Sequence, residues 1–198
     1  TPIEETMDAL ERIKAAGKIR HIGVSNFSLD LTKRAMAAGP VVSFQGLYNM
    51  LERNANSYHN IPLTYRVEDE VLPYCQDNEL AFFPYSPLFQ GLLTDSFKAS
   101  GNFDENDVRS ANPKLVGDTF QTYFEISKKL KEFAREIGKP LSQVAINWLI
   151  NQQPVTSVIC GAQTPQHVKE NVGSVAWELT EEMTTRLSEI IDPFRKNN

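Results

Sequence analysis

The sequence has few residues of the kinds that build disulfide frameworks and metal centres. Its 198 residues include two cysteines, Cys75 and Cys160, and three histidines, His21, His59 and His167. Both cysteines stand in apolar periodic segments, as buried thiols in a reducing compartment do, so we expect no disulfide. The histidines have no spacing that would bring them onto one face with cysteines or paired carboxylates. We therefore expect no metal site.

Long apolar runs and basic clusters are also missing. No stretch approaches the roughly 18 consecutive apolar residues of a membrane span, and the residues from Thr1 onward do not have the basic and apolar regions of a signal peptide. The net charge of −5, with lysine and arginine spread along the chain, disfavours nucleic acid as a partner. Because 41% of the residues are hydrophobic, a core can form. We expect a soluble, cytoplasmic protein.

Hydrophobic periodicity predicts short strands that alternate with helices. Thr1, Pro2 and Glu4 fit a capping box, which would open a first helix that ends at Gly17. The predicted strands are 19–24, 41–45, 80–84 and 156–160. The later helices are 28–38, 67–78, 119–137 and 141–151, with two short ones starting at Thr164 and Thr180. Residues 86–117 form a long polar loop of the kind that is usually functional or mobile.

The third predicted strand indicates how the sheet is built. Its apolar run, Leu80-Ala81-Phe82-Phe83, lacks polar alternation, which favours a parallel strand covered on both faces by helices. Four such strands predict right-handed βαβ units in one α/β domain, residues 1–198, without repeats or linkers. The run Ile22-Gly23-Val24-Ser25-Asn26 does not contain the G-x-G-x-x-G of a doubly wound dinucleotide fold, so we favour a (β/α) barrel.

Polar clusters follow each predicted strand, where a (β/α) barrel holds its ligands. They are Ser25-Asn26, Gln45, Tyr85-Ser86-Pro87-Leu88 and Gly161-Ala162-Gln163-Thr164. Because the carboxyl ends of parallel strands share one edge of the sheet, we expect all four clusters to face the same side.

The strings around these clusters resemble motifs of the aldo-keto reductase family. Residues 17–27, G-K-I-R-H-I-G-V-S-N-F, are very similar to the family's G-K-I-R-x-I-G-V-S-N-F. Residues 84–94 contain elements similar to its Y-S-P-L and G-L-L-T, and Gly161-Ala162 with Glu170-Asn171 resembles its G-A and E-N cofactor loop. The match runs in order from Thr1 to about Asp192. Each motif alone is weak, but jointly they are highly specific.

The resemblance implies a (β/α)8 TIM-barrel fold, of which this chain would supply the last four strands and their helices. The implied activity is NADP(H)-dependent reduction of aldehydes or ketones, with this C-terminal half carrying the cofactor site. The Asp, Tyr, Lys and His that act in the family's catalysis map to no position here, so we assign no catalytic residue. We expect a small carbonyl substrate and, as companion, the N-terminal half or a second copy. The alternative is a non-catalytic nucleotide-binding or structural half-barrel.

The resemblance also assigns cofactor-binding roles. Ser25, Asn26 and Gln45 would hydrogen-bond the nicotinamide carboxamide, and Tyr85 would stack on the ring. The pyrophosphate would lie against Ser86, Pro87, Leu88, Gln90 and Gly91, and the adenosine end against Ile159, Gly161, Ala162, Gln163, Thr164, His167, Glu170 and Asn171. Without the resemblance, Tyr85 reads as a core aromatic, residues 86–91 as a surface turn and Glu170-Asn171 as a solvated helix face.

The choice between NADP and NAD depends on the loop that follows the last predicted strand. Many family members place Arg or Lys there to pair with a 2′-phosphate, whereas this sequence has Gln163 and His167, with Lys169 nearby. A guanidinium is the stronger phosphate partner. The resemblance implies NADP as the cofactor, and the missing guanidinium weakens this preference, so NAD stays possible.

Overall fold

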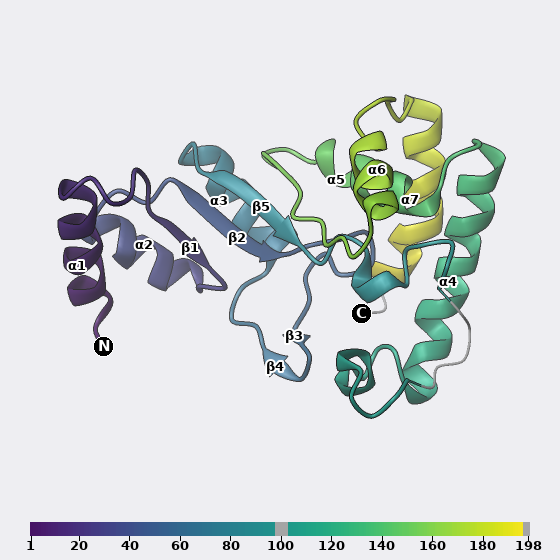
Figure 1. Cartoon of the computed structure of the whole chain (residues 1–198), viewed down its shortest axis with the longest axis horizontal. Coiled ribbons are helices and arrows are strands. Elements are labelled where there is room, and N and C mark those ends of the chain that lie inside the picture. The colour runs from purple at the N-terminus through teal and green to yellow at the C-terminus, as the bar shows by residue number, and fades with distance from the viewer. Residues whose placement is uncertain (98–102, 196–198) are drawn as a thin grey trace.

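The computed structural model describes residues 1–97 and 103–195, which form two bodies side by side (Figure 1). The sheet body holds α1 (Ile3–Ala15), β1 (Gly23–Ser25), α2 (Leu29–Ala38), β2 (Ser43–Leu47), α3 (Leu72–Asp77) and β5 (Ala81–Tyr85). The helical body holds α4 (Gly117–Glu136), α5 (Leu141–Ile150), α6 (Pro165–Gly173) and α7 (Glu181–Arg195). Between β2 and α3 lie the hairpin strands β3 (Ser57–Tyr58) and β4 (Ile61–Pro62) and a π-helical turn, η1 (Val67–Val71). After β5 come two 3-10 turns, η2 (Phe89–Gly91) and η3 (Val108–Ala111).

The three strands pair in parallel in the order β1-β2-β5, which confirms the predicted pairing. The register aligns Val24, Phe44 and Phe82 across the sheet, and all three side chains are buried. They share one core with Met7 of α1 and Cys75 of α3. This face of the sheet is therefore the one that the first three helices cover.

The opposite face of the sheet is open, contrary to the prediction that helices cover both faces. The next aligned row consists of Ser25, Gln45 and Phe83, and these side chains are exposed or half-buried. The helices therefore cover the apolar side chains of the run 80–83 on only one face of the sheet. The sheet keeps a polar row on its open side, and this row includes two of the predicted site residues.

Residues 156–160 do not form the predicted fourth strand, although they lie where it was expected. The backbone N–H groups of Thr156 and Ile159 donate to the carbonyls of Phe82 and Pro84, each at 2.9 Å, and Val155 makes one parallel bridge to Phe82. These contacts are too few for a regular ladder. The segment is an extended chain that follows β5 in parallel, so its carboxyl end reaches the same edge of the sheet.

The helix starts follow the predicted caps in some places and not in others. Thr164 caps α6, where its hydroxyl accepts the N–H of His167 at 3.2 Å, and Thr180 likewise caps α7. The predicted capping box at Thr1 is wrong, because α1 begins only at Ile3 and no side chain caps it. Pro2 fixes an extended backbone there, and its carbonyl accepts the first helical hydrogen bond instead.

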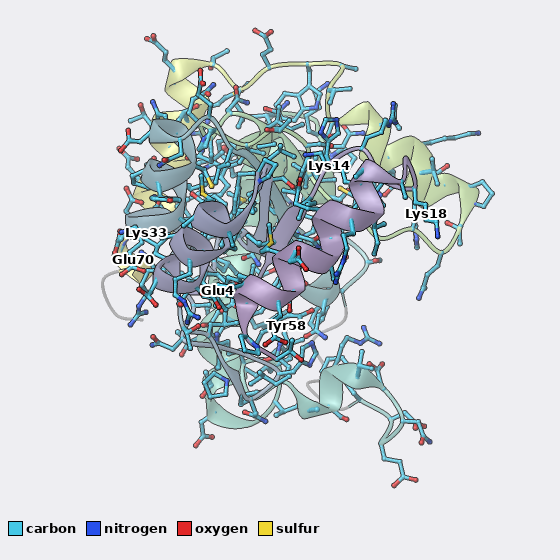
Figure 2. All side chains as sticks on the ribbon, turned by 90° about the vertical axis from the view of Figure 1, so that its left-hand side faces the viewer. Glu4, Lys14, Lys18, Lys33, Tyr58 and Glu70 are labelled. Carbon is cyan, nitrogen blue, oxygen red and sulfur yellow. The ribbon has the colours of Figure 1, made fainter. Side chains whose placement is uncertain are left out.

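The outer face of the sheet body is charged. Figure 2 looks onto α1 and shows Glu4 and Lys14 on the face of that helix turned away from the core, while Ile3 and Met7 are buried. Glu4 pairs with Arg34 of α2 at 2.9 Å, with both side chains about half exposed. Among the described residues, no helix is long and apolar enough to cross a membrane.

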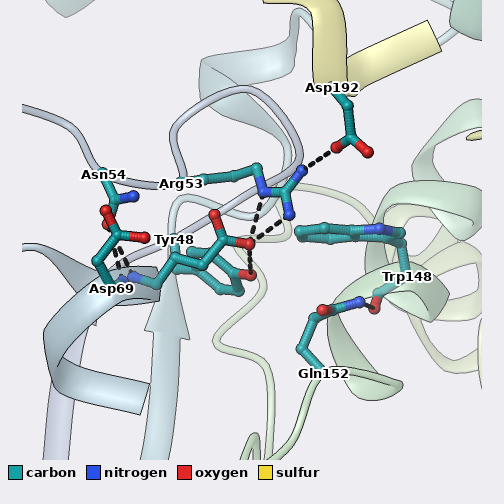
Figure 3. Close-up of polar contacts among 8 residues, drawn as sticks. Tyr48, Arg53, Asn54, Asp69, Trp148, Gln152 and Asp192 are labelled. Atoms are coloured by element: carbon teal, nitrogen blue, oxygen red, sulfur yellow. Dashed lines mark hydrogen bonds and ion pairs between the residues drawn. The ribbon is translucent and has the colours of Figure 1, made fainter. Parts of the chain in front are cut away.

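Arg53 joins the two bodies. Its guanidinium donates to Glu68 of η1 through Nε at 2.7 Å and to Asp192 of α7 through Nη1 at 2.6 Å. It also lies 5.6 Å from the ring centroid of Trp148 on α5 (Figure 3). The side chains of Arg53 and Glu68 are only 14% and 15% exposed. We call Arg53, Glu68, Trp148 and Asp192 together the Arg53 joint.

Candidate functional site

The carboxyl ends of β1, β2 and β5 bring four predicted site residues together. Ser25 and Gln45 are register partners, and the N–H of Asn26 donates to the carbonyl of Gln45 at 3.1 Å. The hydroxyl of Tyr85 donates to Oδ1 of Asn26 at 2.9 Å. We call Ser25, Asn26, Gln45 and Tyr85 the strand-end cluster.

Asn26 is held tightly at the end of β1. Its φ of 59° lies in the left-handed region, which asparagine tolerates better than most residues. Its Oδ1 accepts the hydroxyls of Tyr85 and, at 2.6 Å, of Tyr65. Within the described part of the chain, its Nδ2 makes no hydrogen bond, and the residue is exposed. The amide therefore presents a donor to a ligand at the open face.

The two tyrosines act as hydrogen-bond donors at neutral pH. Burial raises the pKa of Tyr65 and, more strongly, that of Tyr85, because a phenolate is poorly solvated away from water. Both hydroxyls therefore keep their protons, and both can donate to Asn26. This excludes a phenolate base at the cluster.

The predicted pyrophosphate loop has an unusual backbone. Ser86, Phe89, Gln90 and Gly91 have φ values of 56°, 45°, 52° and 96°. Left-handed conformations cost non-glycine residues roughly 1–2 kcal/mol each, so other contacts must hold this loop. One is the hydrogen bond from Nδ2 of the buried Asn49 to the Ser86 carbonyl, at 3.0 Å. Strain of this kind commonly collects at ligand-binding loops.

Two groups that the sequence analysis assigned to phosphate binding are engaged within the protein. The N–H of Gly91 donates to the carbonyl of Leu88 at 2.9 Å, because η2 closes as a 3-10 turn, so this N–H already has a partner within the loop. The Ser86 hydroxyl lies 2.8 Å from that of Tyr58. Pro87 is buried and Leu88 half-buried, so the loop presents its exposed surface mainly through Ser86 and Gln90.

The hairpin β3-β4 adds residues that the sequence analysis left in a loop. Its turn, His59-Asn60, has φ values of 48° and 63°, as a type I′ turn requires. The ring of Tyr58 meets that of Tyr85 edge-on, with centroids 5.4 Å apart, and the side chain of His59 meets that of Gln90 at 3.0 Å. An asparagine between β-forming residues was the signal that could have revealed this hairpin.

His59 is held as a neutral hydrogen-bond acceptor. Oε1 of Gln90 accepts from Nδ2 of Asn112 at 2.7 Å, so the Nε2 of Gln90 donates to Nε2 of His59. Burial lowers the pKa of His59, which favours the same neutral form. Protonation of the imidazole would remove this acceptor.

The remaining predicted residues lie on the loop before α6, residues 159–164, which we call the α6 loop, and on α6 itself. The bond from the N–H of Ile159 to Pro84 places the loop at the edge of the sheet beside β5. All of its residues apart from the half-buried Cys160 are exposed. The N–H groups of His167 and Gln163 are already bonded, to Thr164 Oγ1 and His167 Nδ1 at 3.2 and 3.3 Å. The helix start thus offers fewer free donors than expected.

Asn171 braces the α6 loop, whereas Glu170 bonds within α6. Nδ2 of Asn171 donates to the Gly161 carbonyl at 3.2 Å, and Glu170 accepts from Gln166 at 3.0 Å. A shallow groove of about 470 Å³ beside Asn171 is lined by residues of α5, of α6 and of the chain segments 156–162 and 174–175. The loop, α6 and β5 therefore meet at one end of the sheet.

Comparison with known proteins gives one family. The family model described as "Aldo/keto reductase family" matches residues 1–192. The aldo-keto reductase YhdN of Bacillus subtilis is 30% identical over 192 residues, which are 96% of this chain and 54% of that protein. The aldo-keto reductase yakc [NADP(+)] of Schizosaccharomyces pombe is 29% identical, over 97% of this chain and 54% of its own length. The NADH-specific methylglyoxal reductase of Escherichia coli is 26% identical, over 99% and 56%.

Solved structures agree with the sequence matches. A glycerol dehydrogenase, AKR11B4 from Gluconobacter oxydans, superposes with a TM-score of 0.84 at 28% identity, over 98% of this chain and 55% of that one. The thermostable aldo-keto reductase Tm1743 gives a TM-score of 0.68 at 25% identity, over 96% and 55%. The chain spans about half the length of these relatives, so its fold is about half of a TIM-type barrel.

Proposed function

Because the chain belongs to the aldo/keto reductase family, we propose that it supplies the nicotinamide-binding part of a reductase of aldehydes or ketones. The observation that carries this proposal is the strand-end cluster: a hydroxyl, two amides and an aromatic ring meet at the carboxyl ends of three parallel strands. Ligands in barrels of this type bind at that end. We propose that the chain forms the C-terminal half of the barrel, and the similarity of its motifs to the family's cofactor motifs supports this placement.

The side chains of the cluster suit a carboxamide on an aromatic ring. A bound nicotinamide would supply a hydride for carbonyl reduction. The amide nitrogen of Asn26 and the hydroxyl of Ser25 can donate to a carbonyl oxygen, and the Gln45 amide can accept from an NH₂ group. Tyr85, held by its bond to Asn26, offers a ring with fixed position for stacking. Together they would fix which face of the ring is turned toward a substrate.

The proton that the reduction also needs would come from outside this chain. The family's catalytic Asp, Tyr, Lys and His have no counterpart in the matched motifs, and both tyrosines at the cluster direct their protons to Asn26. We therefore propose that the other part of the barrel supplies the acid. A small carbonyl compound would bind between the two parts.

For the cofactor, we propose NADPH as the preferred ligand, with NADH as the weaker one. The exposed side chains of Gln163 and His167 could hydrogen-bond a 2′-phosphate but carry no guanidinium. Relatives of the chain include one named for NADP(+) and one named as NADH-specific, so the family accommodates both nucleotides.

The proposal is tested by titrating the chain with NADPH and with NADH, using calorimetry, and then assaying reduction of methylglyoxal with and without the remaining barrel half as a separate polypeptide. We expect binding by the chain alone and turnover only with the second polypeptide. Absence of binding would refute the proposal. Binding without turnover in the reconstituted pair would favour a non-catalytic half-barrel.

The placement in the barrel has its own test. We expect the reading frame upstream of the Thr1 codon to encode a segment with the missing strands and the catalytic set. If those strands are instead encoded downstream of Asn198, the C-terminal placement is wrong, whereas the nucleotide titration is unaffected.

A further inference from the structure

Tyr65 contacts the strand-end cluster from a segment that lies outside the short family motifs at 17–27, 84–94 and 161–171. It lies between β4 and η1 and is 3% exposed. Its hydroxyl is within hydrogen-bond distance of two groups, the N–H of Leu47 at 3.2 Å and Oδ1 of Asn26 at 2.6 Å. It therefore links the end of β2 to the end of β1.

The direction of each hydrogen bond follows from the donors present. The Leu47 N–H can only donate, so it uses the phenol oxygen of Tyr65 as its acceptor. The phenol's own proton then goes to Asn26. Because Tyr85 also donates to the same Oδ1, this oxygen accepts two hydrogen bonds.

These bonds fix the orientation of the Asn26 amide. If the amide were turned over, its NH₂ group would face both phenols and their two protons would lose their acceptor. In the observed orientation, Nδ2 points away from the tyrosines and is open to the exposed side. The two tyrosines thus select one of the two amide orientations.

Packing holds the Tyr65 ring in the position that this requires. The ring meets Phe44 edge-on, with centroids 5.7 Å apart. It also lies over Gly46, where an added Cβ would be 3.5 Å from the ring and 3.2 Å from Phe44. The Tyr65 ring therefore lies in close contact with this part of β2, where an added Cβ would be tight only against Phe44.

We infer that Tyr65 is a positioning residue for nicotinamide recognition, which acts by orienting the amide of Asn26. This inference rests on the proposed function, because it assigns the open amide donor to the carboxamide of the cofactor. Tyr65 itself touches no ligand in this account. It deepens the site by adding a residue that is remote from every family motif in the sequence.

The test is the Tyr65→Phe variant, which removes only the hydroxyl. We expect it to weaken NADPH binding about fivefold, as the loss of one positioning hydrogen bond should. The matched control is Tyr74→Phe, which removes a hydroxyl that bonds Met36 on the other side of the sheet body and should leave the affinity unchanged. Tyr65→Phe in an Asn26→Ala background should cause no further loss, because Tyr65 acts through Asn26.

A second variant covers the case in which Tyr65→Phe does not fold. Asn26→Asp keeps an oxygen acceptor for both phenols but replaces the amide donor, so we expect it to fold and to bind NADPH more weakly. Wild-type affinity in Asn26→Asp, or in a folded Tyr65→Phe, would overturn the inference. An additional loss from Tyr65→Phe in the Asn26→Ala background would show that it acts by another route and would also overturn it.

These outcomes are distinct from failure of the proposed function. If the wild-type chain binds neither NADPH nor NADH, both the proposed function and the role of Tyr65 in it fall. If the wild type binds and Tyr65→Phe binds equally well, only the positioning role falls.

Discussion

The strand-end cluster and the α6 loop lie at the same edge of the molecule but are built in different ways. In the cluster, Asn26 is bonded to the backbone of β2 and to two tyrosines. The α6 loop is almost wholly exposed and is held by side chains of α6 and by one backbone hydrogen bond to β5. Under the proposed function, the cluster orients the nicotinamide ring of the cofactor. The loop would hold the charged, flexible adenosine end by surface contacts.

The largest expected effect is on stability and comes from removing Arg53, whose contacts link the sheet body and the helical body. We expect Arg53→Ala to lower the free energy of unfolding by about 3 kcal/mol, because it leaves the largely buried Glu68 carboxylate without its cation and also removes the ion pair with the half-exposed Asp192. Urea unfolding measures this change.

The control for that experiment is Arg34→Ala, which breaks an exposed pair with Glu4. It should cost less than about 1 kcal/mol, since solvent screens such pairs. Equal losses in the two variants would contradict the role of Arg53 as the joint between the bodies.

The next effect concerns the strand-end cluster itself. We expect the double variant Tyr85→Ala, Asn26→Ala to weaken NADPH binding about 30-fold, because it removes an aromatic contact and an amide donor. The matched control removes a tyrosine and an asparagine at the opposite edge, Tyr74→Ala with Asn78→Ala, which should leave the affinity unchanged. Similar affinities for the two double variants would mean that the cluster does not bind the ring.

A substitution in the exposed α6 loop is expected to tighten NADPH binding. Gln163→Arg should tighten NADPH binding about tenfold with little change for NADH, because a guanidinium pairs with the 2′-phosphate that only NADPH carries. Gln121→Arg, on α4, controls for the added charge. If Gln163→Arg tightened both nucleotides equally, the loop would not contact the 2′-phosphate.

The smallest effect is a pH dependence at the hairpin. Burial lowers the pKa of His59 below its ordinary 6.5, so the unfolded chain takes up the proton first as the pH falls. The stability that neutral His59 contributes is therefore fully present above pH 6.5. It is lost as the pH falls through the lowered pKa of the folded state. Between about pH 7.5 and pH 5, the Tm of the wild type should fall by about 2 °C more than that of His59→Asn. If the Tm of both proteins fell equally with pH, neutral His59 would not stabilise the fold as a hydrogen-bond acceptor.

Local sequence patterns predicted the features of this molecule that depend on short segments. The three strands, their parallel direction and the caps at Thr164 and Thr180 follow from periodicity and turn chemistry within about a dozen residues. Residues 156–160 show the limit of this approach. Their apolar pattern indicates an extended segment, but whether it forms a ladder depends on how many hydrogen bonds it makes with β5.

The contacts that shape the site were beyond the reach of local patterns. Tyr65 and Asn26 are 39 residues apart, and Tyr58 meets Ser86 across 28 residues. Such pairs depend on how the hairpin folds back over the strand ends, which no periodicity encodes. The use of the Gly91 N–H inside η2 likewise depends on the left-handed turn, which only the structure reveals.

An NMR titration of the isotope-labelled chain with NADPH, after assignment of the backbone amides, tests most directly whether nicotinamide binds at the strand ends. We predict that the largest shift changes fall together on Ser25, Asn26, Gln45 and Tyr85, with a second group at residues 161–164. Shift changes confined to other surfaces, or scattered over both bodies without these residues, would contradict a nicotinamide site at the strand ends.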